Sequence, residues 1–108
     1  MLQLDDIRRA VTDVAVSLGA HQVILFGSYA RGTATKHSDV DLIIVEDTKA
    51  PFLARLGKYL DPLWENLRTG VEVLVYTPEE FARMQEGPFV RRALREGIVL
   101  YESGKVPA

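Results

Sequence analysis

The chain has 108 residues, a length that is typical of a single domain, and it contains no cysteine. The missing thiols exclude disulfides, thiolate nucleophiles and cysteine-based metal sites. A net charge of −2 lacks the positive field that broad nucleic-acid binding requires. The first ten residues hold no apolar signal segment, and no apolar run is long enough to span a membrane. We therefore expect a cytoplasmic protein.

Hydrophobic periodicity and glycine or proline breaks divide the chain into alternating helices and strands. Apolar residues at helical spacing predict helices over 7–18, 29–31, 50–68, from Thr77 to the break at Gly87-Pro88, and over 88–97. Short runs of strand-forming residues predict strands over 22–26, 39–45, 71–76 and 98–102. This order predicts an α/β domain over residues 1–102, with a frayed tail over 103–108.

Two helices carry local signals of their own. Thr77 is an expected N-cap, Pro78 suits the first helical position, and Glu80 completes a capping box. Pro62 is expected to kink or divide the helix over 50–68.

Two carboxylates interrupt the apolar pattern of the strand over 39–45. Asp39 and Asp41 share one face about 6.6 Å apart, so their charges repel each other unless a cation lies between them. Mg²⁺ fits because it prefers oxygen ligands. Glu72, in the strand over 71–76, adds a third carboxylate if the two strands are neighbours. The opposite face of the first strand is apolar and is expected in the core: Val40, Leu42 and Ile44.

A Gly-Ser turn stands just before this strand in the sequence. Gly27 and Ser28 end the strand over 22–26 and open a helix, where free backbone N–H groups can bind a phosphate. Arg31 and Lys36 follow closely and can offset the charge of a triphosphate. A phosphate site beside a carboxylate cluster favours metal-assisted attack on a nucleotide phosphate.

These residues resemble a known signature. Gly27-Ser28, ten residues, then Asp39-Val40-Asp41 is similar to the G-S-x10-D-x-D motif of the polymerase-beta-type nucleotidyltransferase superfamily. The segment VEVLVYTPEEF (71–81) resembles its third-carboxylate strand and following helix. The short length resembles the minimal nucleotidyltransferase branch, the MntA-like antitoxins usually paired with a HEPN-domain partner. The resemblance implies the nucleotidyltransferase fold, with a small mixed sheet of about four strands and about four flanking helices.

The resemblance also implies roles for individual residues. Gly27 and Ser28 would hold the β- and γ-phosphates of ATP, and Arg31 and Lys36 are further nucleotide-binding candidates. Asp39 and Asp41 would bind two Mg²⁺ ions. Glu72 would be the third acid, as metal ligand or general base; relatives often have Asp there.

The implied reaction is Mg²⁺-dependent transfer of AMP from ATP to a hydroxyl group. Larger members carry a further domain that grips the acceptor, for which 108 residues leave no room. This favours a protein acceptor, and the family context suggests a tyrosine of a HEPN toxin that the protein silences as an antitoxin.

Other interpretations stay open at this point. Ser28 also suits a helix N-cap, the acidic residues also suit solvated strand positions, and Arg31 and Lys36 also suit the solvated surface. The chain could instead be a non-catalytic antitoxin that acts by contact, or an enzyme that modifies a small molecule such as an aminoglycoside. A homo-oligomer is compatible with each of these functions.

Overall fold

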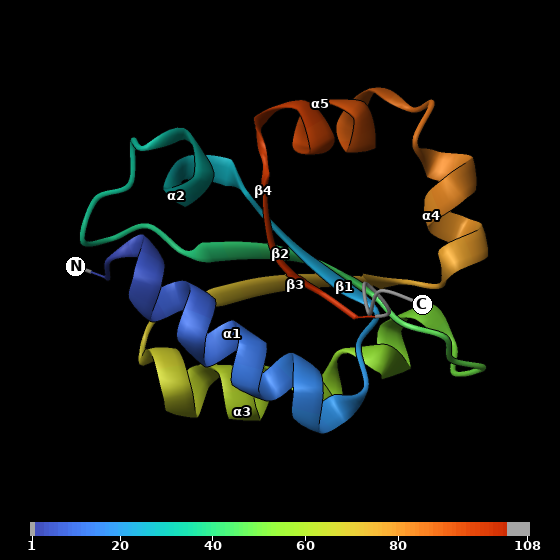
Figure 1. The fold of residues 1–108 in the computed structure, drawn as a ribbon, viewed down its shortest axis with the longest axis horizontal. Coiled ribbons are helices and arrows are strands. Elements are labelled where there is room, and N and C mark those ends of the chain that lie inside the picture. Colours follow the sequence, from blue (N-terminus) through green and yellow to red (C-terminus); the bar gives the residue numbers. More distant parts are fainter. Residues whose placement is uncertain (1, 104–108) are drawn as a thin grey trace.

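The computed structural model describes residues 2–103, in which helices and strands alternate along the chain (Figure 1). The helices are α1 (Leu4–Leu18), α2 (Gly27–Arg31), the 3-10 helix η1 (Phe52–Arg55), α3 (Gly57–Leu67), α4 (Pro78–Met84) and α5 (Pro88–Glu96). The strands are β1 (Gln22–Phe26), β2 (Val40–Val45), β3 (Val71–Tyr76) and β4 (Ile98–Glu102).

The four strands form one mixed sheet in the order β3-β2-β1-β4. β1 runs antiparallel to both β2 and β4, whereas β2 and β3 are parallel. The predicted fold class, a small mixed sheet with flanking helices, is therefore confirmed. The prediction that β2 and β3 are neighbours is also confirmed, and it is the pairing that brings their acidic residues together.

Helices cover both faces of the sheet (Figure 1). α1 and α3 pack on one face in the larger core cluster, which contains the predicted core residues Val40, Leu42 and Ile44. α4 and α5 contribute Phe81, Val90 and Ala93 to a smaller cluster on the other face, where they meet Ile43 and Val45. β2 is thus buried on both faces over most of its length, and only its first residues leave room for carboxylates.

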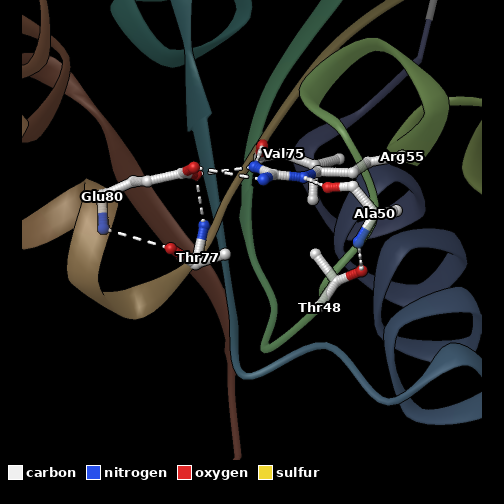
Figure 2. A network of polar contacts seen from close by, with 6 residues as sticks. All are labelled: Thr48, Ala50, Arg55, Val75, Thr77 and Glu80. Atoms are coloured by element: carbon white, nitrogen blue, oxygen red, sulfur yellow. Dashed lines mark hydrogen bonds and ion pairs between the residues drawn. The ribbon is translucent and has the colours of Figure 1, made fainter.

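The helix predicted over 50–68 is wrong as a single element. It is divided into η1 and α3 at Leu56, and Pro62 lies inside α3 without ending it. The side chain of Arg55, the last residue before the division, is buried. Its guanidinium turns back to donate to the carbonyl oxygen of Ala50 at 2.8 Å and forward to that of Val75 at 3.0 Å (Figure 2).

The other boundaries follow the sequence closely. α2 begins at Gly27, two residues earlier than predicted, and β2 begins at Val40, so that Asp39 lies just before the strand. The capping box of α4 is present, because Glu80 N–H donates to Thr77 Oγ1 and Thr77 N–H donates to Glu80 Oε1.

The limits of the domain, residues 1–102, stay a prediction. The predicted tail over 103–108 lies outside the described residues apart from Ser103. None of the helices between residues 2 and 103 has the length and apolar character to cross a membrane.

Candidate active site

The turn after β1 places Gly27 and Ser28 at the entrance to α2. The backbone of Gly27 has a φ angle of 74°, in the left-handed region that favours glycine, while Phe26 before it is extended. A Cβ atom on Gly27 would overlap the carboxylate of Asp41, so a side chain is excluded here for two independent reasons. The turn therefore brings the chain backbone directly against Asp41.

A cleft of about 450 Å³ opens beside this turn. Its lining unites residues predicted from the sequence with residues of α5: Phe26, Gly27, Ser28, Arg31, Asp41, Phe89, Arg92, Ala93 and Glu96. Of the two cations proposed to contact phosphate, only Arg31 lines the cleft. Lys36 is exposed in the loop between α2 and β2 and is not among the lining residues.

Asp41 faces a second carboxylate across the parallel pair of strands. The register places Asp41 opposite Glu72, on the sheet face shared with Ile43. The pKa of the Asp41 carboxyl is raised to about 7, first by burial, then by hydrogen bonding to Glu72 and by the charges of Glu72 and Asp39, while Arg31 opposes the shift. Two acids are therefore held together where they repel each other.

Asp39 lies at the open end of the same strand and is exposed. Its carboxylate occupies the space over Gly70, where a Cβ atom would overlap Asp39 Oδ1. Val40 N–H donates to the Gly70 carbonyl oxygen at 2.9 Å, which fixes the two chain segments against each other. Each aspartate is thus matched to a glycine, Asp41 to Gly27 and Asp39 to Gly70.

The carboxylates suit a divalent cation by their chemistry. Mg²⁺ prefers oxygen donors, and a cation would relieve the repulsion that raises the pKa of Asp41. Within residues 2–103, Asp39, Asp41 and Glu72 are not gathered into a three-residue metal-binding group. By their oxygen donors the paired Asp41 and Glu72 fit a cation, and the charge of Asp39 is near enough to raise the pKa of Asp41.

Sequence reasoning missed the contributions of α5 and of Gly70. Glu96 Oε1 lies 3.2 Å from Arg92 Nε and 3.8 Å from Arg31 Nη1, so it links a cation of α5 to a cation of α2 across the cleft. The spacing of Arg92 and Glu96 by four residues is visible in the sequence. Nothing in the sequence places that helix face beside Gly27-Ser28, because the contact is long-range.

Comparisons with known proteins identify the family of the chain and its fold. The sequence model described as "Nucleotidyltransferase domain" matches residues 7–101. The chain is 39% identical over 82 residues to a Methanocaldococcus jannaschii protein named "Putative protein adenylyltransferase MJ0604", covering 74% of this chain and 77% of that protein.

Solved structures share the fold at low sequence identity. A toxin–antitoxin crystal structure with AMP-PNP superposes with a TM-score of 0.66 at 18% identity, over 90% of this chain and 74% of that chain. A mutant of the toxin–antitoxin pair MntA-HpeT gives a TM-score of 0.63 at 16% identity, with the same two coverages of 90% and 74%.

Proposed function

The chain belongs to the nucleotidyltransferase domain family, and from this membership we propose that it transfers AMP from ATP to a hydroxyl group of a protein. The observation that carries the proposal is the cleft in which Gly27 and Ser28 lie beside Asp41, whose neighbour across the sheet is Glu72. A phosphate-binding turn next to paired carboxylates is the arrangement that phosphoryl chemistry with a cation requires. The naming of a relative as a protein adenylyltransferase supports the choice of AMP and of a protein acceptor.

In this proposal the phosphates of ATP lie along the turn. The backbone at Gly27 and the hydroxyl of Ser28 hold the β- and γ-phosphates, and Arg31, which lines the same cleft, balances their charge. Arg92 of α5 is a further cation in the lining of the cleft. Lys36 plays a smaller part, since its side chain is outside the cleft lining.

The acids act at the other side of the transferred phosphate. Asp41 and Glu72 would hold Mg²⁺, and Asp39 would join them once the ion is bound. The ion would neutralise triphosphate charge and lower the pKa of the attacking hydroxyl. The acceptor oxygen bonds to the α-phosphorus, the bond from that phosphorus to the α,β-bridging oxygen breaks, and pyrophosphate leaves. In this proposal Glu72 accepts the hydroxyl proton; its greater exposure than that of its partner Asp41 supports this role.

We place this activity in a toxin–antitoxin pair in the cytoplasm. Two of the structural neighbours are toxin–antitoxin complexes, which supports a toxin as the acceptor. The acceptor group we propose is a tyrosine hydroxyl of a HEPN-domain toxin. The absence of cysteine is compatible with a reducing compartment.

The test follows the label from two positions of ATP. The protein is incubated with Mg²⁺ and the product of the adjacent reading frame, once with ATP labelled at the α-phosphate and once at the γ-phosphate. AMP transfer predicts label on the acceptor from the α position only. Transfer that persists in Asp41→Asn would overturn the assignment of the acids.

Rescue of toxin-carrying cells, compared with the label transfer, separates the enzyme from a non-catalytic antitoxin. Cells that carry the toxin are rescued by wild type in both cases. Rescue by the Asp39→Asn/Asp41→Asn double variant, with no label transferred by wild type, would show that contact alone neutralises the toxin.

A further inference from the structure

β3 is an edge strand with open backbone groups at its outer side. Val40 N–H donates to the Gly70 carbonyl and Glu46 N–H to that of Tyr76, both at 2.9 Å, so the even-numbered residues of this stretch face β2. Successive residues of a strand direct their backbone groups to opposite sides, so Val71, Val73 and Val75 face outward. Among residues 2–103, the outward groups of Val71 and Val73 form no hydrogen bond.

At the C-terminal end of β3, an outward backbone group already has a hydrogen-bond partner. Arg55 Nη1 donates to the Val75 carbonyl oxygen at 3.0 Å, as Figure 2 shows. The same guanidinium is held by both carboxylate oxygens of Glu80, at 2.6 and 3.1 Å. Arg55 therefore confines the open edge to the half of β3 that carries Glu72.

An apolar groove of about 450 Å³ runs along this open half. Its lining comes from α3 and the residue before it, from β3, from the end of β1 and from α5: Phe26, Leu56, Leu60, Val71, Glu72, Val73, Leu74 and Phe89. Glu72 is the single charged residue in that lining. Unpaired backbone groups flanked by apolar walls match an extended polypeptide, which offers backbone bonds along its length and alternating side chains.

The groove is continuous with the candidate active site. Phe26 and Phe89 line both the groove and the cleft, and their rings meet edge to face with centroids 5.5 Å apart. Glu72 lines the groove, while Asp41, opposite to it in the register, lines the cleft. The two carboxylates therefore lie where the groove meets the cleft.

We propose that the acceptor binds as an extended segment that adds a strand to the outer edge of β3 at Val71–Val73. Apolar side chains of this segment occupy the groove, and its hydroxyl-bearing side chain reaches past Phe26 and Phe89 to Asp41 and Glu72. This inference rests on the proposed function for the nature of the acceptor. It adds the recognition mode: the chain recognises an extended backbone with alternating apolar residues.

The test uses a fluorescent decapeptide with a central tyrosine and alternating apolar residues. In Val71→Pro, the outward N–H is lost while the bonds to β2 remain, because proline is tolerated on the open side of an edge strand. The matched control is Val99→Pro on β4, the other edge, where the Val99 carbonyl already accepts from Arg8. We expect the dissociation constant of the peptide, from anisotropy, to rise about tenfold in Val71→Pro and to stay unchanged in Val99→Pro.

Two further measurements keep the test decisive if Val71→Pro fails to fold. In the wild type, bound peptide should slow hydrogen exchange of the Val71 and Val73 amides, and methylation of the peptide backbone nitrogens next to tyrosine should abolish this protection. Equal binding of the methylated peptide, or no binding of the unmodified one, would overturn the inference. Protection that arises instead from self-association through β3, detected by sedimentation, would overturn it as well.

Failure of the proposed function would look different. A peptide that binds and protects Val71 and Val73 but receives no label from ATP leaves the docking mode in place and contradicts AMP transfer to a tyrosine. Label on free tyrosine amide with no peptide binding contradicts the docking mode and leaves the chemistry in place.

Discussion

At the residue scale, two glycines leave the space that the carboxylates of the candidate site occupy. Gly27 and Gly70 are the positions where a Cβ atom would overlap the carboxylates of Asp41 and Asp39. Gly27 also needs its left-handed backbone, whereas Gly70 does not. Gly70 is therefore the cleaner probe, because a substitution there acts on Asp39 and not on backbone strain.

We expect Gly70→Ala to lower kcat/KM for AMP transfer by about tenfold to a hundredfold, because the new methyl group displaces the Asp39 carboxylate. The free energy of unfolding, measured in urea, should change by less than about 1 kcal/mol. Gly57→Ala is the matched control, since a Cβ atom at Gly57 meets nothing within 4 Å. Unchanged transfer in Gly70→Ala would show that the reaction does not need the Asp39 carboxylate in its position over Gly70.

The contributions of Arg31 and Lys36 to MgATP binding can be distinguished by substitution. Only Arg31 lines the cleft, although both were predicted from the sequence to contact phosphate. Arg31→Gln should raise the dissociation constant of MgATP about tenfold, or ~1.4 kcal/mol, whereas Lys36→Gln should leave it unchanged. Isothermal titration calorimetry checks both, and equal effects of the two substitutions would contradict the placement of the triphosphate.

At the element scale, one buried guanidinium connects three elements. Arg55 of η1 bonds to the Val75 carbonyl of β3 and to Glu80 of α4, and Glu80 in turn caps its own helix through Thr77 (Figure 2). The sequence predicted the capping box but not Arg55, which lies within an apparently continuous amphipathic pattern. Glu80 therefore has two structural roles: it caps α4 and it binds Arg55. Only the helix cap can be predicted from the sequence.

This network predicts a pH dependence of stability. The pKa of Glu80 is lowered to about 2, first by its hydrogen bond from Arg55 and then by the backbone of Thr77. A lowered folded pKa means that the stabilisation is complete above the unfolded value of about 4.3 and is lost as the pH falls toward 2. Urea unfolding between pH 2 and 6 should show this loss in wild type and a flatter profile in Glu80→Gln. Parallel profiles would contradict it.

The elements themselves were largely predictable because local signals agree with the tertiary structure. β1, β3 and β4 have the predicted bounds, and Gly19 ends α1 as expected. The division at Leu56 and the approach of α5 to the cleft were not predictable, because both depend on contacts between distant segments. The same holds for the pairing of Asp41 with Glu72, which was expected only on the condition that their strands are neighbours.

At the scale of the whole molecule, the proposed function requires an acid in β2 that we expect to lower stability. Ile43 and Val45 are packed under α4 and α5 while Val40, Leu42 and Ile44 are packed under α1 and α3, so the strand cannot move to separate its acid from Glu72. The repulsion is therefore retained in the folded protein and relaxed in the unfolded chain. If the proposed activity requires this acid, the protein has a lower free energy of unfolding than it would have with a neutral residue at position 41.

Asp41→Asn should consequently raise the melting temperature of the metal-free protein while abolishing AMP transfer. A gain of about 1 kcal/mol corresponds to roughly 4–8 °C in a domain of this size. The folded pKa of Asp41, about 7, exceeds the ordinary value of 3.8, so the folded state binds the extra proton between these values. The advantage of Asp41→Asn should be full above pH 7 and vanish as the pH falls below about 4.

The exposed Asp47 supplies the control, since Asp47→Asn removes one negative charge outside the site. It should leave the melting temperature within about a degree of wild type at each pH. Adding MgATP should then reverse the order of wild type and Asp41→Asn, because a ligand that binds only the folded wild-type site stabilises it by mass action. If Asp41→Asn melts below wild type without metal, the two carboxylates stabilise each other by a shared proton, and the opposition between stability and function in β2 does not exist.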